Sequence, residues 1–144
     1  MVADSSYLLK KLDYNMISTM KTLNVALGVA IAEATRSEHN VKHGAVLVKK
    51  GKIIQSGRNQ YCGMERIRHF NSRIWSIHAE MNILAGLPRN MTRGADIMVV
   101  RVNSRGDIVN SKPCHICMSM IKNAGCRKVF YSNDDGKISS HLVR

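Results

Sequence analysis

The stretch SIHAEMNIL, residues 76–84, places a histidine and a glutamate at the start of an apolar run. The apolar residues recur at helical steps, so the pattern predicts a helix that begins near His78 and that Pro88 stops. A helix start needs only an ordinary capping residue. The ionisable pair His78 and Glu80 at this point therefore suggests a chemical role in addition to a structural one.

A second stretch, SKPCHICMSMI at residues 111–121, contains a C-x-x-C pair formed by Cys114 and Cys117. Pro113 near the start and Gly125 after the end predict a short helix between them. In a chain with cytosolic features, cysteines are metal ligands or core residues more often than disulfide partners. The pair is therefore a candidate source of two thiolate ligands.

His78, Cys114 and Cys117 together are a set of ligands that suits Zn²⁺. Three protein ligands leave the fourth tetrahedral position open for water, which is the arrangement of catalytic zinc sites rather than structural ones. The positive ends of the two helices favour the thiolate form of the cysteines. Glu80 need not share the metal and can instead move a proton of the water, whose pKa zinc lowers towards ~7.

Two other interpretations of these cysteines are possible from the sequence. A lone C-x-x-C can be a redox pair, and a structural zinc site would want a fourth protein ligand, for which His115 or Cys126 could be proposed. His115 lies between the two cysteines with its side chain directed differently along the helix, and Cys126 is more simply a small core residue. Taken with His78 and Glu80, the pattern favours the catalytic site.

The chain has 144 residues, of which 44% are hydrophobic and 22% charged, and this composition is that of one globular domain spanning residues 1–144. No apolar stretch approaches the 18 or so residues that a membrane span needs. The N-terminal MVADSSYLLKKLDY does not have the pattern of a secretory signal. We therefore expect an intracellular protein of the cytoplasm, with the nucleus left open, and no membrane partner.

Net charge is the unusual feature of the composition. Twenty-two Lys and Arg against ten Asp and Glu give +12, with a pI near 10.0. Such a field attracts phosphate groups, whether on a nucleotide, on RNA or on DNA. Solubility alone is the competing explanation for the charge.

The rest of the chain is predicted to form helices that alternate with strands. Apolar residues recur at helical spacing from Met16 to Ala34. This stripe predicts a long amphipathic helix that ends near Ser37. The predicted strands are a hairpin around Gly51, a buried strand DIMVVRV, a strand RKVFYS, and a last strand at 137–143. Such alternation implies a central sheet covered by helices on both faces.

The combination of His78-Ala79-Glu80 with Pro113-Cys114-x-x-Cys117 resembles the signature H-x-E…P-C-x-x-C of the zinc-dependent cytidine and deoxycytidylate deaminase superfamily. The resemblance covers roughly residues 44–132. HAEMN looks most like the deoxycytidylate deaminases, and GAVLV with the later G-R-N is similar to the paired upstream strands of the superfamily.

The resemblance implies a three-layer α/β/α fold with a central mixed sheet and hydrolytic deamination at C4 of cytosine or C6 of adenine. Glu80 would protonate the ring nitrogen and then the departing amine. Asn59 would hold the sugar or base, and the backbone N–H of Ala79 would contact the pyrimidine carbonyl. Gly44 and Ala45 would line the base pocket. Relatives commonly associate, so a homo-oligomer is expected.

The segment YCGMERIRHFNSRIWS, residues 61–76, leads into the histidine and is basic, with aromatic residues interleaved. Arg66, Arg68 and Arg73 could bind the 5′-phosphate of a nucleotide or guide a nucleic-acid strand. A solvated loop with packed aromatics is the competing interpretation. This segment also replaces the loop that takes part in nucleotide regulation in deoxycytidylate deaminases, which puts such regulation in doubt.

The sequence-based hypothesis is a zinc-dependent deaminase of a cytosine nucleotide, most simply deoxycytidylate (dCMP) to deoxyuridylate (dUMP). The net charge favours a first alternative, a polynucleotide deaminase acting on single-stranded DNA or on RNA such as tRNA. A second alternative is a non-catalytic zinc-containing nucleic-acid-binding protein or partner subunit. Glu80 argues against that alternative, because such proteins often lose the proton-shuttling carboxylate.

Overall fold

A mixed β-sheet forms the middle layer of the computed structural model, which describes residues 5–61 and 76–143. Its neighbouring strands follow the order β2-β1-β5-β7-β8, and β6 pairs with β5 off this path. β5 and β7 are parallel, and the other pairs of the sheet are antiparallel. The strands are β1 (Lys42–Lys49), β2 (Lys52–Arg58), β5 (Asp96–Val102), β6 (Ile108–Val109), β7 (Lys128–Ser132) and β8 (Ile138–Leu142).

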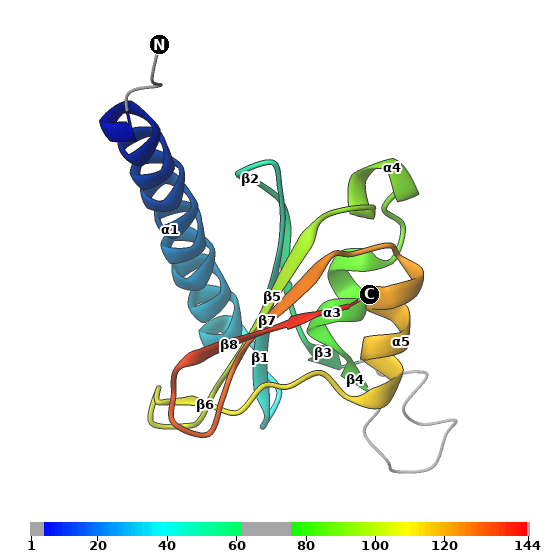
Figure 1. Ribbon diagram of the computed structural model, residues 1–144. Coiled ribbons are helices and arrows are strands. Elements are labelled where there is room, and N and C mark those ends of the chain that lie inside the picture. Colours follow the sequence, from blue (N-terminus) through cyan, green and yellow to red (C-terminus); the bar gives the residue numbers. More distant parts are fainter. Residues whose placement is uncertain (1–4, 62–75, 144) are drawn as a thin grey trace.

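Helices cover both faces of this sheet (Figure 1). α1 (Ser5–Arg36) lies on one face, and α3 (Ala79–Leu84) and α5 (His115–Asn123) lie on the other. The predicted three-layer α/β/α fold with a mixed central sheet is therefore confirmed. The remaining described elements are short, namely α4 (Arg89–Thr92) and a separate antiparallel pair, β3 (Gln60–Tyr61) with β4 (Ser76–Ile77).

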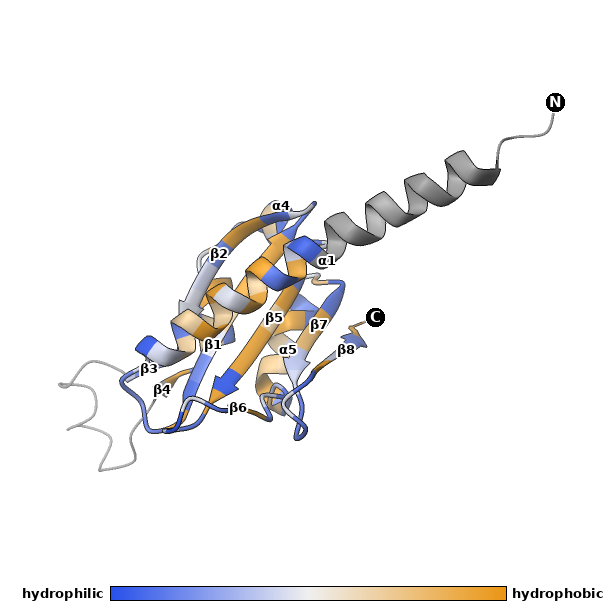
Figure 2. Cartoon of the chain, turned by 90° about the vertical axis from the view of Figure 1, so that its left-hand side faces the viewer, coloured by the Kyte–Doolittle hydropathy of each residue, from blue (hydrophilic) through white to orange (hydrophobic). Residues whose placement is uncertain are grey.

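Helix α1 packs closely on β1 because position 44 is a glycine. A Cβ atom at Gly44 would lie 2.0 Å from the carbonyl oxygen of Ala30 and 2.7 Å from the backbone nitrogen of Ala34. Both alanines are fully buried. Small residues on the two elements bring their backbones into direct contact, so Gly44 faces α1 (Figure 2 shows the helix crossing the sheet).

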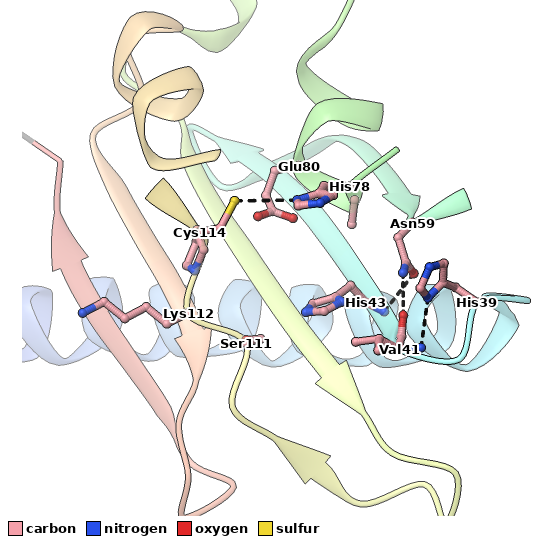
Figure 3. Close-up of a pocket in the computed structure, with 11 residues that line it drawn as sticks. His39, Val41, His43, Asn59, His78, Glu80, Ser111, Lys112 and Cys114 are labelled. Atoms are coloured by element: carbon pink, nitrogen blue, oxygen red, sulfur yellow. Dashed lines mark hydrogen bonds between the residues drawn. The ribbon is translucent and has the colours of Figure 1, made fainter. Parts of the chain in front are cut away.

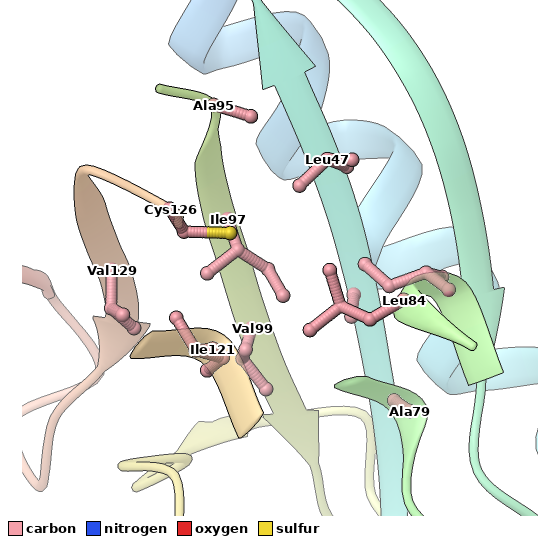
Figure 4. Packing of buried hydrophobic residues seen from close by; sticks show 11 residues of the cluster. Leu47, Ala79, Leu84, Ala95, Ile97, Val99, Ile121, Cys126 and Val129 are labelled. Atoms are coloured by element: carbon pink, nitrogen blue, oxygen red, sulfur yellow. The ribbon is translucent and has the colours of Figure 1, made fainter. Parts of the chain in front are cut away.

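Successive residues of β1 alternate between the two apolar cores of the molecule. Val46 and Val48 belong to the cluster on the α1 side. Ala45 and Leu47 belong to the cluster on the α3 and α5 side, which Figure 4 shows from close by. The second cluster holds the ends of the two helices in place, and these ends carry the sequence motifs. Its further members include Ala79, Ile83, Ile97, Val99, Ile121, Cys126 and Val129.

Two element boundaries differ from the sequence prediction. α1 begins at Ser5, well before the predicted apolar stripe, and ends at Arg36 as expected. α3 ends at Leu84 rather than running to Pro88, because the chain turns at Ala85, which is extended (φ −62°, ψ 127°), and at Gly86, which is left-handed (φ +83°). The predicted last strand is confirmed as β8.

Within residues 5–61 and 76–143, no helix has both the length and the apolar character that crossing a membrane requires.

Candidate active site

The ends of α3 and α5 bring the three predicted metal ligands together. His78 is the residue that precedes α3, Cys114 precedes α5, and Cys117 lies in the first turn of α5. Nδ1 of His78 lies 3.2 Å from Sγ of Cys117 and 3.8 Å from Sγ of Cys114. The ligand atoms of all three lie within 4.8 Å of one another, and these residues form the one such group among the residues that the structure describes.

These distances fit a zinc ion. With Zn–N near 2.0–2.1 Å and Zn–S near 2.3 Å, tetrahedral geometry separates a nitrogen and a sulfur ligand by roughly 3.6 Å. The two observed separations, 3.2 and 3.8 Å, lie on either side of this value. The donor set of one imidazole and two thiols is also one that zinc prefers. The group therefore suits zinc with little movement of the side chains.

Cys117 is the ligand that depends most on a positive charge nearby. Its side chain is fully buried, and this burial, with the adjacent Glu80 carboxylate, raises the pKa of the Cys117 thiol strongly. A divalent cation at this point would reverse the effect, because a coordinating thiol is deprotonated outright. Cys114, in contrast, is exposed, and its Sγ accepts a hydrogen bond from the backbone N–H of Cys117 at 3.4 Å.

Glu80 lies beside the ligands without joining their group. The residue is only 4% exposed, in the first turn of α3. Burial raises the pKa of the Glu80 carboxyl, while hydrogen bonds to its own backbone and to the Cys117 thiol and the charge of His78 act in the opposite direction. A carboxyl whose pKa is raised towards neutrality can both take and return a proton at working pH. Figure 3 shows it between His78 and Cys114.

A cavity of about 270 Å³ opens onto this group. This volume lies just below the range of about 300–1,000 Å³ for small-molecule sites, so the cavity suits a small ligand. Among the described residues that line it, Glu80 is the only carboxylate, whereas several are basic. The lining residues are His39, Val41, His43, Asn59, His78, Ala79, Glu80, Ser111, Lys112, Pro113 and Cys114.

Asn59 fixes the segment that leads into β1. Its Oδ1 accepts hydrogen bonds from the Ser37 hydroxyl at 2.6 Å and from the His43 backbone N–H at 2.9 Å. Its Nδ2 donates to the Val41 carbonyl, and its backbone N–H donates to the His43 carbonyl at 3.2 Å. Asn82, in α3, donates to the Arg58 carbonyl at 2.9 Å. This bond holds Arg58, the residue before Asn59, next to α3.

The hairpin of β5 and β6 brings Ser111 to the cavity. In this hairpin, Arg101 and Val102 pair with Val109 and Ile108. Ser111 donates a hydrogen bond to the Val99 carbonyl at 2.6 Å and accepts one from the Ser132 backbone N–H at 2.8 Å. These bonds anchor the chain just before the Pro113-Cys114 turn.

Among the described residues, only some of those predicted to contact the substrate line the cavity. Asn59 and Ala79 line the cavity. Gly44 faces α1 instead, and Ala45 is fully buried in the apolar core. The predicted contacts Arg66, Arg68 and Arg73 lie outside the described residues.

The two residues that could be proposed as a fourth zinc ligand, Cys126 and His115, lie apart from the ligand group. Cys126 is 2% exposed in the apolar cluster, and burial raises the pKa of its thiol to about 11. His115 is exposed. Neither belongs to the ligand group found among the described residues.

Sequence reasoning missed several lining residues, notably His39, His43, Ser111 and Lys112. His43 and Ser111 lie one and two residues from a recognised motif, so proximity was a usable signal for both. His39 had no such signal, because its place depends on its backbone hydrogen bond to the Ser37 hydroxyl at 3.2 Å and on its ring contact with Tyr61, with centroids 4.6 Å apart.

The fold resembles solved deaminases. A cytidine deaminase from Burkholderia pseudomallei is 22% identical, with a TM-score of 0.59, over 83% of this chain and 91% of the other. A dCMP deaminase from the cyanophage S-TIM5, without ligand, is 24% identical, with a TM-score of 0.54, over 78% of this chain and 84% of the other. At these identities the likeness shows the fold. A comparison with curated protein sequences found no significant match.

The family assignment comes from the sequence model for the cytidine and deoxycytidylate deaminase zinc-binding region, which matches residues 20–133. This match covers most of the chain, including all three ligands and the carboxylate beside them. It agrees with the geometry described above, in which the two motifs meet at one cavity. The chain therefore belongs to the cytidine and deoxycytidylate deaminase family, and it is a zinc-dependent hydrolytic deaminase.

Proposed function

We propose that this deaminase converts a free cytosine nucleotide, dCMP, to dUMP with release of ammonia. The observation that carries the proposal is the single cavity in which the ligand group, Glu80 and basic side chains converge. His78, Cys114 and Cys117 would hold the zinc ion. When bound, zinc makes water a nucleophile near neutral pH by lowering its pKa.

Glu80 would carry the proton through the reaction. Its carboxylate takes a proton from the attacking water and gives it to N3 of cytosine, and it then passes a proton to the amine that leaves C4. The C4–N bond breaks, a C4 carbonyl forms, and ammonia is released. The burial of Glu80 supports this role, because it brings the pKa of the carboxyl closer to that of the groups between which the proton moves.

The first residue of α3 offers a contact for the base. The N–H groups of the first turn of a helix have no partner within the helix. Ala79 opens α3 and lines the cavity. Its N–H is thus suited to donate to the carbonyl oxygen at C2 of the pyrimidine, which would orient C4 towards the metal ligands.

A negatively charged substrate suits the walls of the cavity. Lys112 carries a positive charge at the cavity wall, as Figure 3 shows, and Glu80 is the one acidic residue among the described lining residues. A phosphate is attracted by such a basic lining. The volume near 270 Å³ suits a single nucleotide, and the HAEMN motif supports the deoxycytidylate over the cytidylate.

A polynucleotide is the second candidate substrate, and the net charge of +12 favours it. The salt dependence of binding distinguishes the two substrates. Affinity for a polynucleotide, with many phosphates, should fall steeply with salt concentration, whereas affinity for a nucleotide with one phosphate should fall only slightly.

The test is kcat/KM for dCMP, cytidylate, deoxycytidine and a cytosine-containing single-stranded DNA, each measured at 50 and 200 mM salt. The proposal expects dCMP to be the best substrate, with a change of less than about tenfold between the two salt concentrations. Turnover of the DNA alone, with a loss of 10³-fold or more at the higher salt, would replace the proposal with the polynucleotide candidate.

We also propose that the chain forms a homo-oligomer, as its resemblance to other deaminases implies. Light scattering coupled to size-exclusion chromatography measures this directly. A mass equal to the 16.1 kDa of one chain at micromolar concentration would contradict it.

A further inference from the structure

His43 presents its side chain on the catalytic side of the sheet. Successive residues of a strand point to opposite faces, so residues 43, 45 and 47 of β1 share one face. Ala45 and Leu47 belong to the core beneath α3 and α5. His43 continues that face beyond the core, where it lines the cavity, and Figure 3 shows its ring below Glu80 and His78.

The backbone of His43 is fixed from both sides. Its N–H donates to Asn59 Oδ1 at 2.9 Å, and its carbonyl accepts from the Asn59 backbone N–H at 3.2 Å. The residue is also in register with Arg101 in β5. These contacts fix the backbone from which the ring projects into the cavity wall.

Other neutral polar side chains among the described residues of the cavity wall already form hydrogen bonds within the protein. Asn59 Oδ1 already accepts two hydrogen bonds. The Ser111 hydroxyl donates to Val99 and accepts from the Ser132 N–H, and its oxygen also lies 2.7 Å from Ser132 Oγ. Nδ1 of His39 accepts from the Val41 N–H at 3.0 Å.

The His43 ring retains an acceptor. Burial, together with Arg101, His78 and His39, lowers the pKa of His43 to about 4, so the ring is neutral at physiological pH. A neutral imidazole has one N–H donor and one acceptor nitrogen. Whichever ring nitrogen carries the hydrogen, the other remains free to accept one.

We propose that His43 determines substrate specificity by accepting a hydrogen bond from the 3′-hydroxyl of a free deoxyribonucleotide. The inference rests on the proposed function, because it needs a sugar in this cavity. With the base at Glu80, the sugar is the part of a nucleotide that carries a hydroxyl donor. Inside a polynucleotide the 3′-oxygen is esterified and has no hydrogen to donate. The contact would therefore favour the mononucleotide over the polymer.

The test is a double-mutant cycle between the protein and its substrate. Wild-type and His43→Val zinc-loaded proteins are assayed for kcat/KM on dCMP and on 2′,3′-dideoxycytidine monophosphate, which lacks the hydroxyl. The wild type should prefer dCMP by about 10-fold, as expected for one lost hydrogen bond to a partly buried acceptor. His43→Val should lower that preference to about 2-fold or less, mainly through KM for dCMP.

Two further variants serve as controls for the effect of His43→Val. His43→Gln keeps a neutral acceptor and should restore part of the preference, while His141→Val makes the matched change at an exposed residue of β8 outside the cavity and should keep all of it. Thermal melting checks that each variant is folded.

The outcomes separate the two claims. If the wild type hydrolyses dCMP but His43→Val slows both substrates equally, the His43 contact is refuted and the proposed function stands. If the wild type hydrolyses no cytosine mononucleotide, the proposed function fails and the His43 contact fails with it.

Discussion

Nδ1 of His78 lies 3.2 Å from Sγ of Cys117, although 39 positions of the chain separate the two residues. The first residue precedes α3 and the second lies in the first turn of α5. The apolar cluster that contains Ala79 and Ile121 packs these two helices on the same face of the sheet. Packing of the core thus assembles the metal site from two motifs.

Removal of zinc should destabilise the protein. Because a ligand that binds only the folded state stabilises it by about 4 kcal/mol at a thousandfold excess over Kd, a chelator should lower Tm by on the order of 10 °C. Differential scanning calorimetry with and without chelator measures this. Cys117→Ala should melt at one temperature in both conditions, whereas Cys126→Ala, changed outside the ligand group, should keep the response. A chelator response in Cys117→Ala would argue against Cys117 as a ligand.

Glu80→Gln should abolish activity while the zinc stays bound. The amide has nearly the same shape as the carboxyl but cannot shuttle a proton, so kcat should fall by about 10²–10⁴-fold. Because burial raises the pKa of Glu80, replacing this carboxyl should cost little stability. Metal analysis, melting and steady-state kinetics test the three statements. Wild-type kcat in Glu80→Gln would rule out Glu80 as the proton carrier.

Gly44→Ala should weaken the packing of α1 on the sheet. The added Cβ would lie 2.0 Å from a backbone oxygen of α1, which cannot move aside as a side chain can. We expect a loss of about 1–3 kcal/mol in the free energy of unfolding, measured by urea denaturation. Gly28→Ala is the matched control, because open space surrounds that helical glycine, and it should stabilise by about 0.5–1 kcal/mol. Equal stabilities for the two variants would show that α1 and β1 are not in close contact.

Much of the fold could be predicted because its elements carry strong patterns. Helical spacing predicted α1, and the apolar run with the Pro and Gly signals predicted β5 and α5. The length of α1 was underestimated, since the predicted apolar stripe begins near its middle. The end of α3 was placed too late because the turn at Ala85 and Gly86, and not the proline after it, ends the helix.

The ligand group could be predicted because each motif is local, with its ligands at the start of a helix. The cavity wall could not, for two physical reasons. Residues 44–48 of β1 are buried on both faces, so hydropathy does not reveal which face Gly44 or Ala45 occupies. His43 is positioned by a hydrogen bond to Asn59, and His39 packs its ring against Tyr61. Such contacts between distant residues leave no periodic signal in the sequence.

Acid should destabilise the wild type more than His43→Val. The pKa of His43 is lowered from 6.5 to about 4 in the folded state by burial and by Arg101 in β5, His78 before α3 and His39 before β1. The unfolded chain therefore binds more protons than the folded one between pH 4 and 6.5, so stability is present above 6.5 and is lost as pH falls towards 4.

Between pH 7 and pH 5 the wild type should lose about 2 kcal/mol more than His43→Val in the free energy of unfolding. Denaturant titrations at both pH values measure the difference. Both proteins have the same metal ligands, so any stability lost through release of zinc in acid is equal in the two and drops out of their difference. Parallel losses would show that His43 titrates normally in the folded protein.

The most direct measurement of the central claim is ammonia release from dCMP by the zinc-loaded protein, with Glu80→Ala as the blank. Ammonia should appear in equal amount to dUMP with the wild type, and neither should rise above background with the variant. Ammonia release at the same rate by Glu80→Ala, or none from dCMP by folded, zinc-loaded wild type, would contradict the claim that this cavity deaminates a cytosine nucleotide through Glu80.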